Sequence, residues 1–200
     1  MTTVAAPPKA VTAAQLVSHI LTPVVLGSAL LLSTPVRHPE VSWLSAVLGT
    51  VFTMLLPWSI LAVARLRGKV SNIHVSQRHQ RHWIYAVTAL SMVGGLALLT
   101  VIGTATALYV EIGAFAVGLL LVSLINLWWK VSVHLAVGTY VVLHAFADVA
   151  PTAAIVLFVS LLSWARVRCS EHTASQVFGG VLVGVVVGYL TQWTSQLLLS

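Results

Sequence analysis

Seven long runs of apolar residues, separated by short polar segments, make up almost the whole chain. They span residues 11–33, 43–66, 83–102, 105–128, 133–148, 151–166 and 173–198. A helix needs about 20 mainly apolar residues to cross the hydrocarbon core of a bilayer. Five runs reach that length, whereas the fifth and sixth have 16 residues each. The pattern therefore predicts an all-α fold, a polytopic membrane helix bundle with six or seven transmembrane helices.

The composition agrees with an integral membrane protein. Hydrophobic residues make up 58% of the chain, charged residues only 7%, and the mean hydropathy is +0.99, whereas soluble domains carry about 25% charged residues. No domain boundary, long repeat or low-complexity segment interrupts the series of runs, so we expect one transmembrane domain at residues 11–200. We expect residues 1–10 to form a short flexible tail, which lacks the features of a removed signal peptide. The net charge of +6 is scattered at the ends of the runs, which excludes a basic face for nucleic acid.

Three polar clusters interrupt the apolar pattern, at loops around residues 67–82, 129–134 and 166–176. With seven crossings, the loops after the second, fourth and sixth helices emerge on one face of the membrane, and these loops hold the clusters. A single crossing over residues 133–166 would instead put the second and third clusters on opposite faces. Pro151 favours two helices there, because proline restricts the residue before it and suits a first helical turn.

The cations predict which face carries the clusters. Of the ten Lys and Arg residues, only Arg37 falls on the opposite face. Because cytoplasmic loops carry an excess of Lys and Arg, we expect the clusters to face the cytoplasm, in a membrane of the bacterial plasma-membrane type.

The clusters contain groups that bind phosphate. Arg81 and Arg166 can each offer forked donors to two phosphate oxygens, and Lys130 adds a point charge. Ser132 supplies a hydroxyl near a helix start, where free backbone amides also attract anions. Together these residues predict an anion site without a metal ion.

Two histidines in the clusters supply the chemistry. The neutral imidazole of His172, placed in line behind phosphorus, can attack and form a phosphohistidine that water later hydrolyses. His134 can protonate the leaving oxygen. Gln176 lies four residues after His172, on the same face of a helix, and its amide oxygen can accept the imidazole N–H. Glu171 is badly placed to do so for its own neighbour, and we expect it to pair with an arginine.

Two segments carry a family resemblance. Residues 130–134, Lys-Val-Ser-Val-His, and residues 165–180, with Arg166, His172 and Gln176 in order, resemble the second and third motifs of type 2 phosphatidic acid phosphatases. Vanadium haloperoxidases share that site. The resemblance implies that His172 is the nucleophile, His134 the general acid, and Gln176 a replacement for the aspartate that orients the nucleophile.

The resemblance also implies a phosphate cradle built by Ser132, Arg166 and Arg81. At the first motif His74 stands where the family has lysine, and Lys69 or Lys130 could replace the missing charge. The implied activity is hydrolysis of a lipid phosphomonoester or diphosphate, of the phosphatidic acid, phosphatidylglycerol phosphate or polyprenyl phosphate class, without a cofactor.

Two alternatives remain open for these clusters. Because Gln176 replaces a carboxylate and the first motif is altered, the site could hold lipid phosphate without hydrolysing it. The eight histidines could instead include ligands of haem b in an electron-transfer subunit, which would require facing pairs at matching depth.

Two further features lie inside the predicted helices. Glu111 is costly in a bilayer unless it is paired, and His144 or Tyr140 could partner it, either around a polar pocket or in a structural hydrogen bond. Glycines at four-residue spacing in the last run allow close approach of another helix, either within the bundle or from a second copy in a homo-oligomer. These glycines are Gly180, Gly184 and Gly188.

Overall fold

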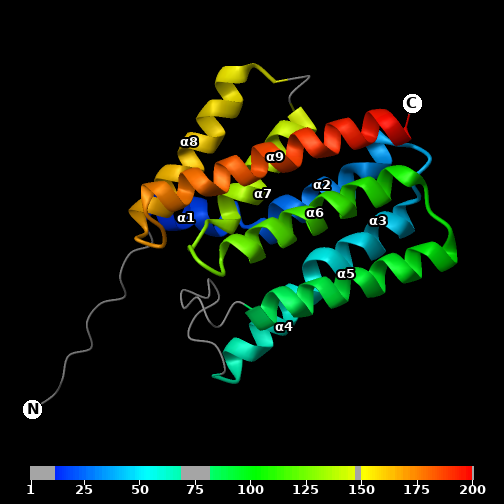
Figure 1. Cartoon of the computed structure of the whole chain (residues 1–200), viewed down its shortest axis with the longest axis horizontal. Coiled ribbons are helices and arrows are strands. Elements are labelled where there is room, and N and C mark those ends of the chain that lie inside the picture. Colours follow the sequence, from blue (N-terminus) through cyan, green and yellow to red (C-terminus); the bar gives the residue numbers. More distant parts are fainter. Residues whose placement is uncertain (1–11, 69–81, 147–149, 200) are drawn as a thin grey trace, which may run out of the picture.

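The computed structural model describes residues 12–68, 82–146 and 150–199, and every regular element in these ranges is helical (Figure 1). The all-α prediction is thereby confirmed. In chain order the elements are α1 (Ala13–Ile20), α2 (Pro23–Arg37), α3 (Trp43–Thr50), η1 (Val51–Leu55), α4 (Leu56–Leu66), α5 (His82–Ile102), α6 (Thr106–Ile125), α7 (Val133–Phe146), α8 (Thr152–Arg168) and α9 (Ala174–Leu198).

Five helical segments are long and apolar enough to cross a membrane, judged by length and composition within the described residues. They are Ala13–Arg37, Trp43–Leu66, Trp83–Ile102, Thr106–Ile125 and Ala174–Leu198. Helix α7 has only 14 residues, fewer than the ~20 that a spanning helix needs. It packs against α2, α6, α8 and α9, so this short helix is enclosed by protein. The segments fit a multi-pass membrane protein.

The first apolar run, predicted as one helix over residues 11–33, is two helices in the structure. Helix α1 ends at Ile20, and α2 begins at Pro23 after Thr22, whose hydroxyl accepts from Val25 N at 3.3 Å. Proline lacks the N–H that would continue the helix but suits the first turn of a new one. Helix α2 then extends to Arg37, beyond the predicted end.

The second run, predicted at residues 43–66, contains a turn of π-helix, η1, between α3 and α4. Pro57 follows directly and cannot donate a backbone hydrogen bond. Such wide turns interrupt the regular helical hydrogen bonds and are frequent at functional sites. Here the turn directs Thr53 and Met54 into the protein interior.

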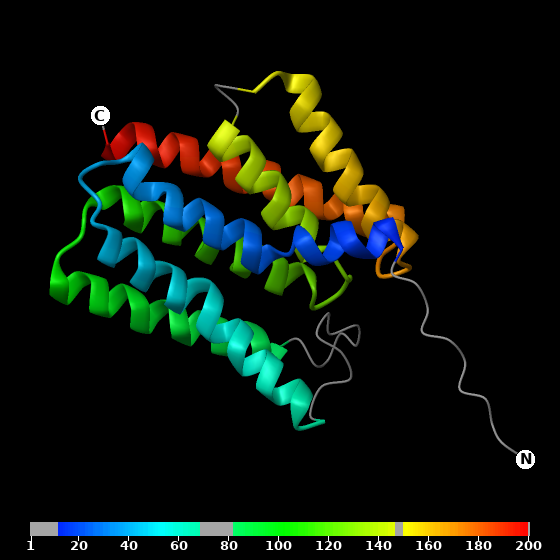
Figure 2. The same ribbon diagram turned by 180° about the vertical axis from the view of Figure 1, so that it is seen from behind.

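The fifth and sixth runs are separate helices, as predicted. Helix α7 ends at Phe146 and α8 begins at Thr152, with Pro151 at its N-cap. Figure 2 shows the two helices as a hairpin, so the segment before α7 and the segment after α8 lie at the same end of the bundle. The polar clusters at residues 129–134 and 166–176 are therefore neighbours.

The glycines of α9 receive α7 of the same chain. A Cβ atom on Gly180 would lie 2.5 Å from the Ser132 carbonyl oxygen, and one on Gly184 would lie 2.6 Å from that of Ala136. Only glycine permits this approach. Packing within the bundle therefore accounts for Gly180 and Gly184, which are buried and offer no surface to a second copy. A Cβ atom on Gly188 would lie 3.9 Å from the Leu143 side chain.

Candidate functional site

The turn between α8 and α9 places His172. Helix α8 ends in a Schellman motif, in which Ser170 N donates to Val167 O at 2.9 Å and Glu171 N donates to Arg166 O at 3.3 Å. Ser170 takes the left-handed conformation at φ 56°, where glycine is usual. The chain thereby reverses sharply, and His172 is buried just before α9 begins.

Arg166, in the last turn of α8, has the largest fully buried side chain among the described residues. A guanidinium that is only 2% exposed is costly to bury unless acceptors or anions surround it. Glu171 supplies a compensating negative charge, with its Oε2 atom 4.0 Å from Arg166 Nη2. The prediction that Glu171 pairs with an arginine is confirmed.

The loop before α7 is joined to the start of α9 by two hydrogen bonds. Lys130 Nζ donates to the carbonyl oxygen of Glu171 at 2.7 Å, and Ser132 N donates to that of Gln176 at 3.1 Å. Lys130 was expected to bind phosphate, but one of its donors ties the two loops together. This contact and the close approach at Gly180 bring the second and third predicted motifs together.

Ser132 and His134 stand at the start of α7. Both are buried, and Ser132 O accepts the first bond of the helix, from Ala136 N at 3.1 Å. Among the described residues, the Ser132 hydroxyl has no hydrogen-bond partner. A buried hydroxyl usually has one, but Ser132 is fully buried and does not line the cavity described below.

Gln176 has a structural role that the sequence reasoning missed. Its Oε1 atom accepts from Thr173 N at 3.2 Å, while the Thr173 hydroxyl accepts from Gln176 N at 3.3 Å. This reciprocal pair is a capping box, which the spacing of Thr173 and Gln176 signals in the sequence. The oxygen that we expected to accept from His172 is therefore engaged at the N-terminus of α9.

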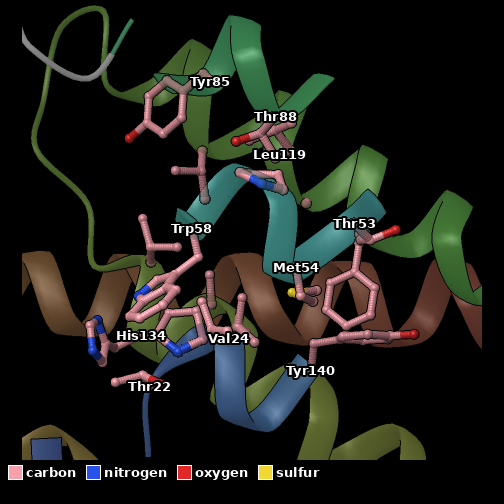
Figure 3. Close-up of a pocket in the computed structure, with 18 of the residues that line it drawn as sticks. Thr22, Val24, Thr53, Met54, Trp58, Tyr85, Thr88, Leu119, His134 and Tyr140 are labelled. Atoms are coloured by element: carbon pink, nitrogen blue, oxygen red, sulfur yellow. The ribbon is translucent and has the colours of Figure 1, made fainter. Parts of the chain in front are cut away.

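A cavity of about 280 Å³ opens between the α4–α5 pair and the rest of the bundle. His134, Arg166 and His172 all line it, and most of its other walls are apolar. In Figure 3, His134, Thr22 and Trp58 lie toward one side, and Tyr140, Met54 and Thr53 toward the other. The cavity thus has a polar end with a buried cation and two imidazoles, and an apolar body.

The structure does not describe every predicted site residue. Arg81 and His74 lie outside the described residues. Conversely, helices α4, α5 and η1 contribute walls that the motifs did not indicate, with Trp58, Tyr85 and Thr53 among them. Their only sequence signal is the presence of polar and aromatic residues in otherwise aliphatic runs.

Glu111 is the centre of a second polar cluster, toward the opposite end of the bundle. Its carboxylate accepts from Tyr140 at 3.1 Å and lies 3.0 Å from His144 Nε2, so both predicted partners are confirmed. Arg37 adds an ion pair at 2.7 Å that was not predicted. Glu111 and His144 do not line the cavity, whereas Tyr140 does. The arrangement agrees with a structural hydrogen bond.

No group of three His, Cys, Asp or Glu side chains is placed to hold a metal ion within residues 12–68, 82–146 and 150–199. Comparison with protein-family models, with curated proteins and with solved structures finds no match for the chain.

Proposed function

We propose that the protein is a membrane-embedded lipid phosphatase that works through a phosphohistidine. The supporting observation is that His134, from the second polar cluster, and Arg166 and His172, from the third, line a single largely apolar cavity. A lipid phosphate has the matching form, with an anionic head attached to an apolar tail.

In this proposal the head occupies the polar end of the cavity. The buried Arg166 guanidinium offers forked donors to two phosphate oxygens. The family resemblance adds the Ser132 hydroxyl, although Ser132 does not itself line the cavity. Burial away from water strengthens these interactions with the charge of the transferring phosphoryl group. Arg81 and His74 complete the cradle in the resembling family's pattern.

The reaction has two steps. His172 attacks phosphorus, and a P–N bond forms as the bond from phosphorus to the leaving oxygen breaks, while protonated His134 gives its proton to that oxygen. Water then attacks the phosphohistidine, His134 takes a proton from the water, and the P–N bond breaks to release inorganic phosphate. His134 is protonated again at the end, so the cycle closes.

Substrates of the resembling family include phosphatidic acid, phosphatidylglycerol phosphate and polyprenyl phosphates, and we propose one of these classes. The cytoplasmic orientation in a bacterial-type plasma membrane belongs to the same proposal. Cations concentrated at the end of the bundle that carries the site support it. They are Arg65, Arg67, Lys130, Arg166 and Arg168.

A second candidate function is binding of lipid phosphate without hydrolysis. The capping role of Gln176 favours it, because the oxygen proposed to orient His172 already accepts from Thr173 N. An amide oxygen also stabilises a developing imidazolium less than a carboxylate does, which lowers the rate of the nucleophile. The two candidates share one site and differ in turnover.

Hydrolysis and binding without hydrolysis are distinguished by measuring phosphate release from the purified protein over a panel of the three lipid classes. We expect turnover in the wild type and none above background in His172→Ala. His134→Ala should lose about 10² to 10⁴ of the rate, the usual contribution of a general acid. His38→Ala is the matched control, since His38 lies between α2 and α3 beside Glu40, 3.5 Å away, and should leave the rate unchanged.

Persistent turnover in His172→Ala would remove the proposed nucleophile. Saturable binding of the same lipids with no release of phosphate would establish the second candidate instead. The absorbance spectrum of the same preparation tests the haem alternative, because a Soret band would favour it over both.

A further inference from the structure

Tyr140 lines the cavity on the side opposite His134 of the proposed phosphate site (Figure 3). His134 and Tyr140 lie on the same helix, six residues apart, which is about 9 Å along its axis at ~1.5 Å per residue. Both line the cavity, and Figure 3 shows them at opposite sides of it. Phe115 also lines the cavity and contacts Tyr140.

The Tyr140 ring is held from three sides. Its hydroxyl donates to Glu111 Oε2 at 3.1 Å. Phe115 meets it edge-on, with ring centroids 5.4 Å apart at 88°, and His144 stacks on it at 5.4 Å and 19°. A ring fixed in this way cannot swing aside to admit a longer ligand without breaking these contacts.

Glu111 is itself anchored, so the hydroxyl contact is rigid. Arg37 Nη1 lies 2.7 Å from Glu111 Oε1 and His144 Nε2 lies 3.0 Å from the same atom. The polar cluster that the phosphatase chemistry leaves unused therefore has an identifiable effect on the cavity, since it fixes the position of Tyr140.

We propose that Tyr140 is a specificity-determining residue that limits the length of the ligand's tail. The proposal rests on the proposed function in that the head must sit beside Arg166 and the two site histidines. A cavity of about 280 Å³ holds roughly nine groups of the size of a water molecule, at ~30 Å³ each, and a methylene group is of similar size. The head fills part of this volume, so the remaining space accepts a tail segment of fewer than nine such groups.

The test measures binding of straight-chain alkyl phosphates that differ only in tail length. In the wild type the affinity should rise with each added methylene, by up to about fourfold, and then level off when the tail reaches Tyr140. In Tyr140→Ala the rise should continue over several more methylenes. Partition into detergent acts equally on both proteins, so their ratio at each length reports the site alone.

Two further variants keep the test decisive. Ala114→Leu puts a larger side chain into the cavity lining next to Phe115, and it should move the plateau to shorter tails, the direction opposite to Tyr140→Ala. Tyr189→Ala removes a tyrosine that is 70% exposed on α9 and should leave the length profile of the wild type. If Tyr140→Ala does not fold, the shift in Ala114→Leu still decides the matter.

An unchanged plateau in folded Tyr140→Ala or in Ala114→Leu would overturn the inference, as would a wild-type affinity that keeps rising with length. The phosphatase proposal can fail separately. A plateau that moves with these variants but no release of phosphate would leave the length limit in place and remove the hydrolytic function, whereas turnover with a plateau independent of Tyr140 would do the reverse.

Discussion

The Glu111 cluster offers a quantitative test of how the bundle is stabilised. Glu111 is 2% exposed and interacts with three groups on two other helices, at 2.7 Å, 3.0 Å and 3.1 Å. Replacing it with leucine leaves the Arg37 charge and the Tyr140 hydroxyl without their acceptor. We therefore expect this variant to lose a large part of the free energy of unfolding.

The magnitude follows from burial and exposure. Breaking a buried ion pair by removing one partner costs about 3–5 kcal/mol, and the Arg37 side chain, 25% exposed, recovers part of this by hydration. We expect about 3 kcal/mol for Glu111→Leu, and about 2 kcal/mol for Glu111→Gln, which keeps the shape and one acceptor oxygen. Because Arg37→Leu/Glu111→Leu leaves no unpaired charge, the double variant should lose about 1–3 kcal/mol less than the sum of the singles.

Thermal unfolding in detergent of the wild type, Glu111→Leu, Glu111→Gln, Arg37→Leu and the double variant measures these terms. For a chain of this size, about 1 kcal/mol shifts Tm by roughly 2–4 °C, so Glu111→Leu should melt about 6–12 °C below the wild type. Glu40→Leu is the matched control, because Glu40 is 53% exposed and should shift Tm by little. If the loss of unfolding free energy in the double variant equals the sum of the losses in Arg37→Leu and Glu111→Leu within about 0.5 kcal/mol, the Arg37–Glu111 pair is not energetically coupled and the argument is refuted.

Three further predictions test the packing and the site. Gly184→Ala should lower the free energy of unfolding by about 1–3 kcal/mol through overpacking against α7. Gly94→Ala adds a methyl group in open space and should raise the free energy of unfolding by about 0.5–1 kcal/mol. Equal Tm values for the two variants would contradict the close α7–α9 contact. If Gln176 acts through the capping box, Thr173→Ala and Gln176→Ala should lower the rate of phosphate release by similar factors, and a much larger loss in Gln176→Ala would show that it orients His172. Chelation with EDTA should leave phosphate release unchanged, and its loss on chelation would contradict a metal-free mechanism.

The apolar runs predicted the helices well because five of the seven runs match the length of a helix in a bilayer. The exceptions have local causes. Pro23 divides the first run, and a π-turn before Pro57 interrupts the second. Pro151 lies between two apolar runs, so the helix break there was predicted. Pro23 and Pro57 lie inside continuous runs, and hydropathy alone does not reveal that proline lacks the backbone N–H of a regular helix.

The candidate site was less predictable, because the sequence shows residue types and not contacts. The motif spacing selected His134, Arg166 and His172, and these residues do line one cavity. The cost of burying the Glu111 charge suggested Tyr140 and His144 as its partners, and both contact it. The Arg37 partner was missed, since a cation at a helix end reads as a loop residue. The capping role of Gln176 was missed, because its spacing from His172 outweighed the capping signal given by Thr173.

Trapping of the phosphorylated protein tests the central claim most directly. Wild-type protein is mixed with a lipid phosphate labelled in its phosphorus, quenched, and assayed for label bound to the protein. We predict a linkage that is stable in alkali and labile in acid, as for a phosphohistidine, located at His172 and absent from His172→Ala. Turnover without any labelled protein, or label at a residue other than His172, would contradict the account.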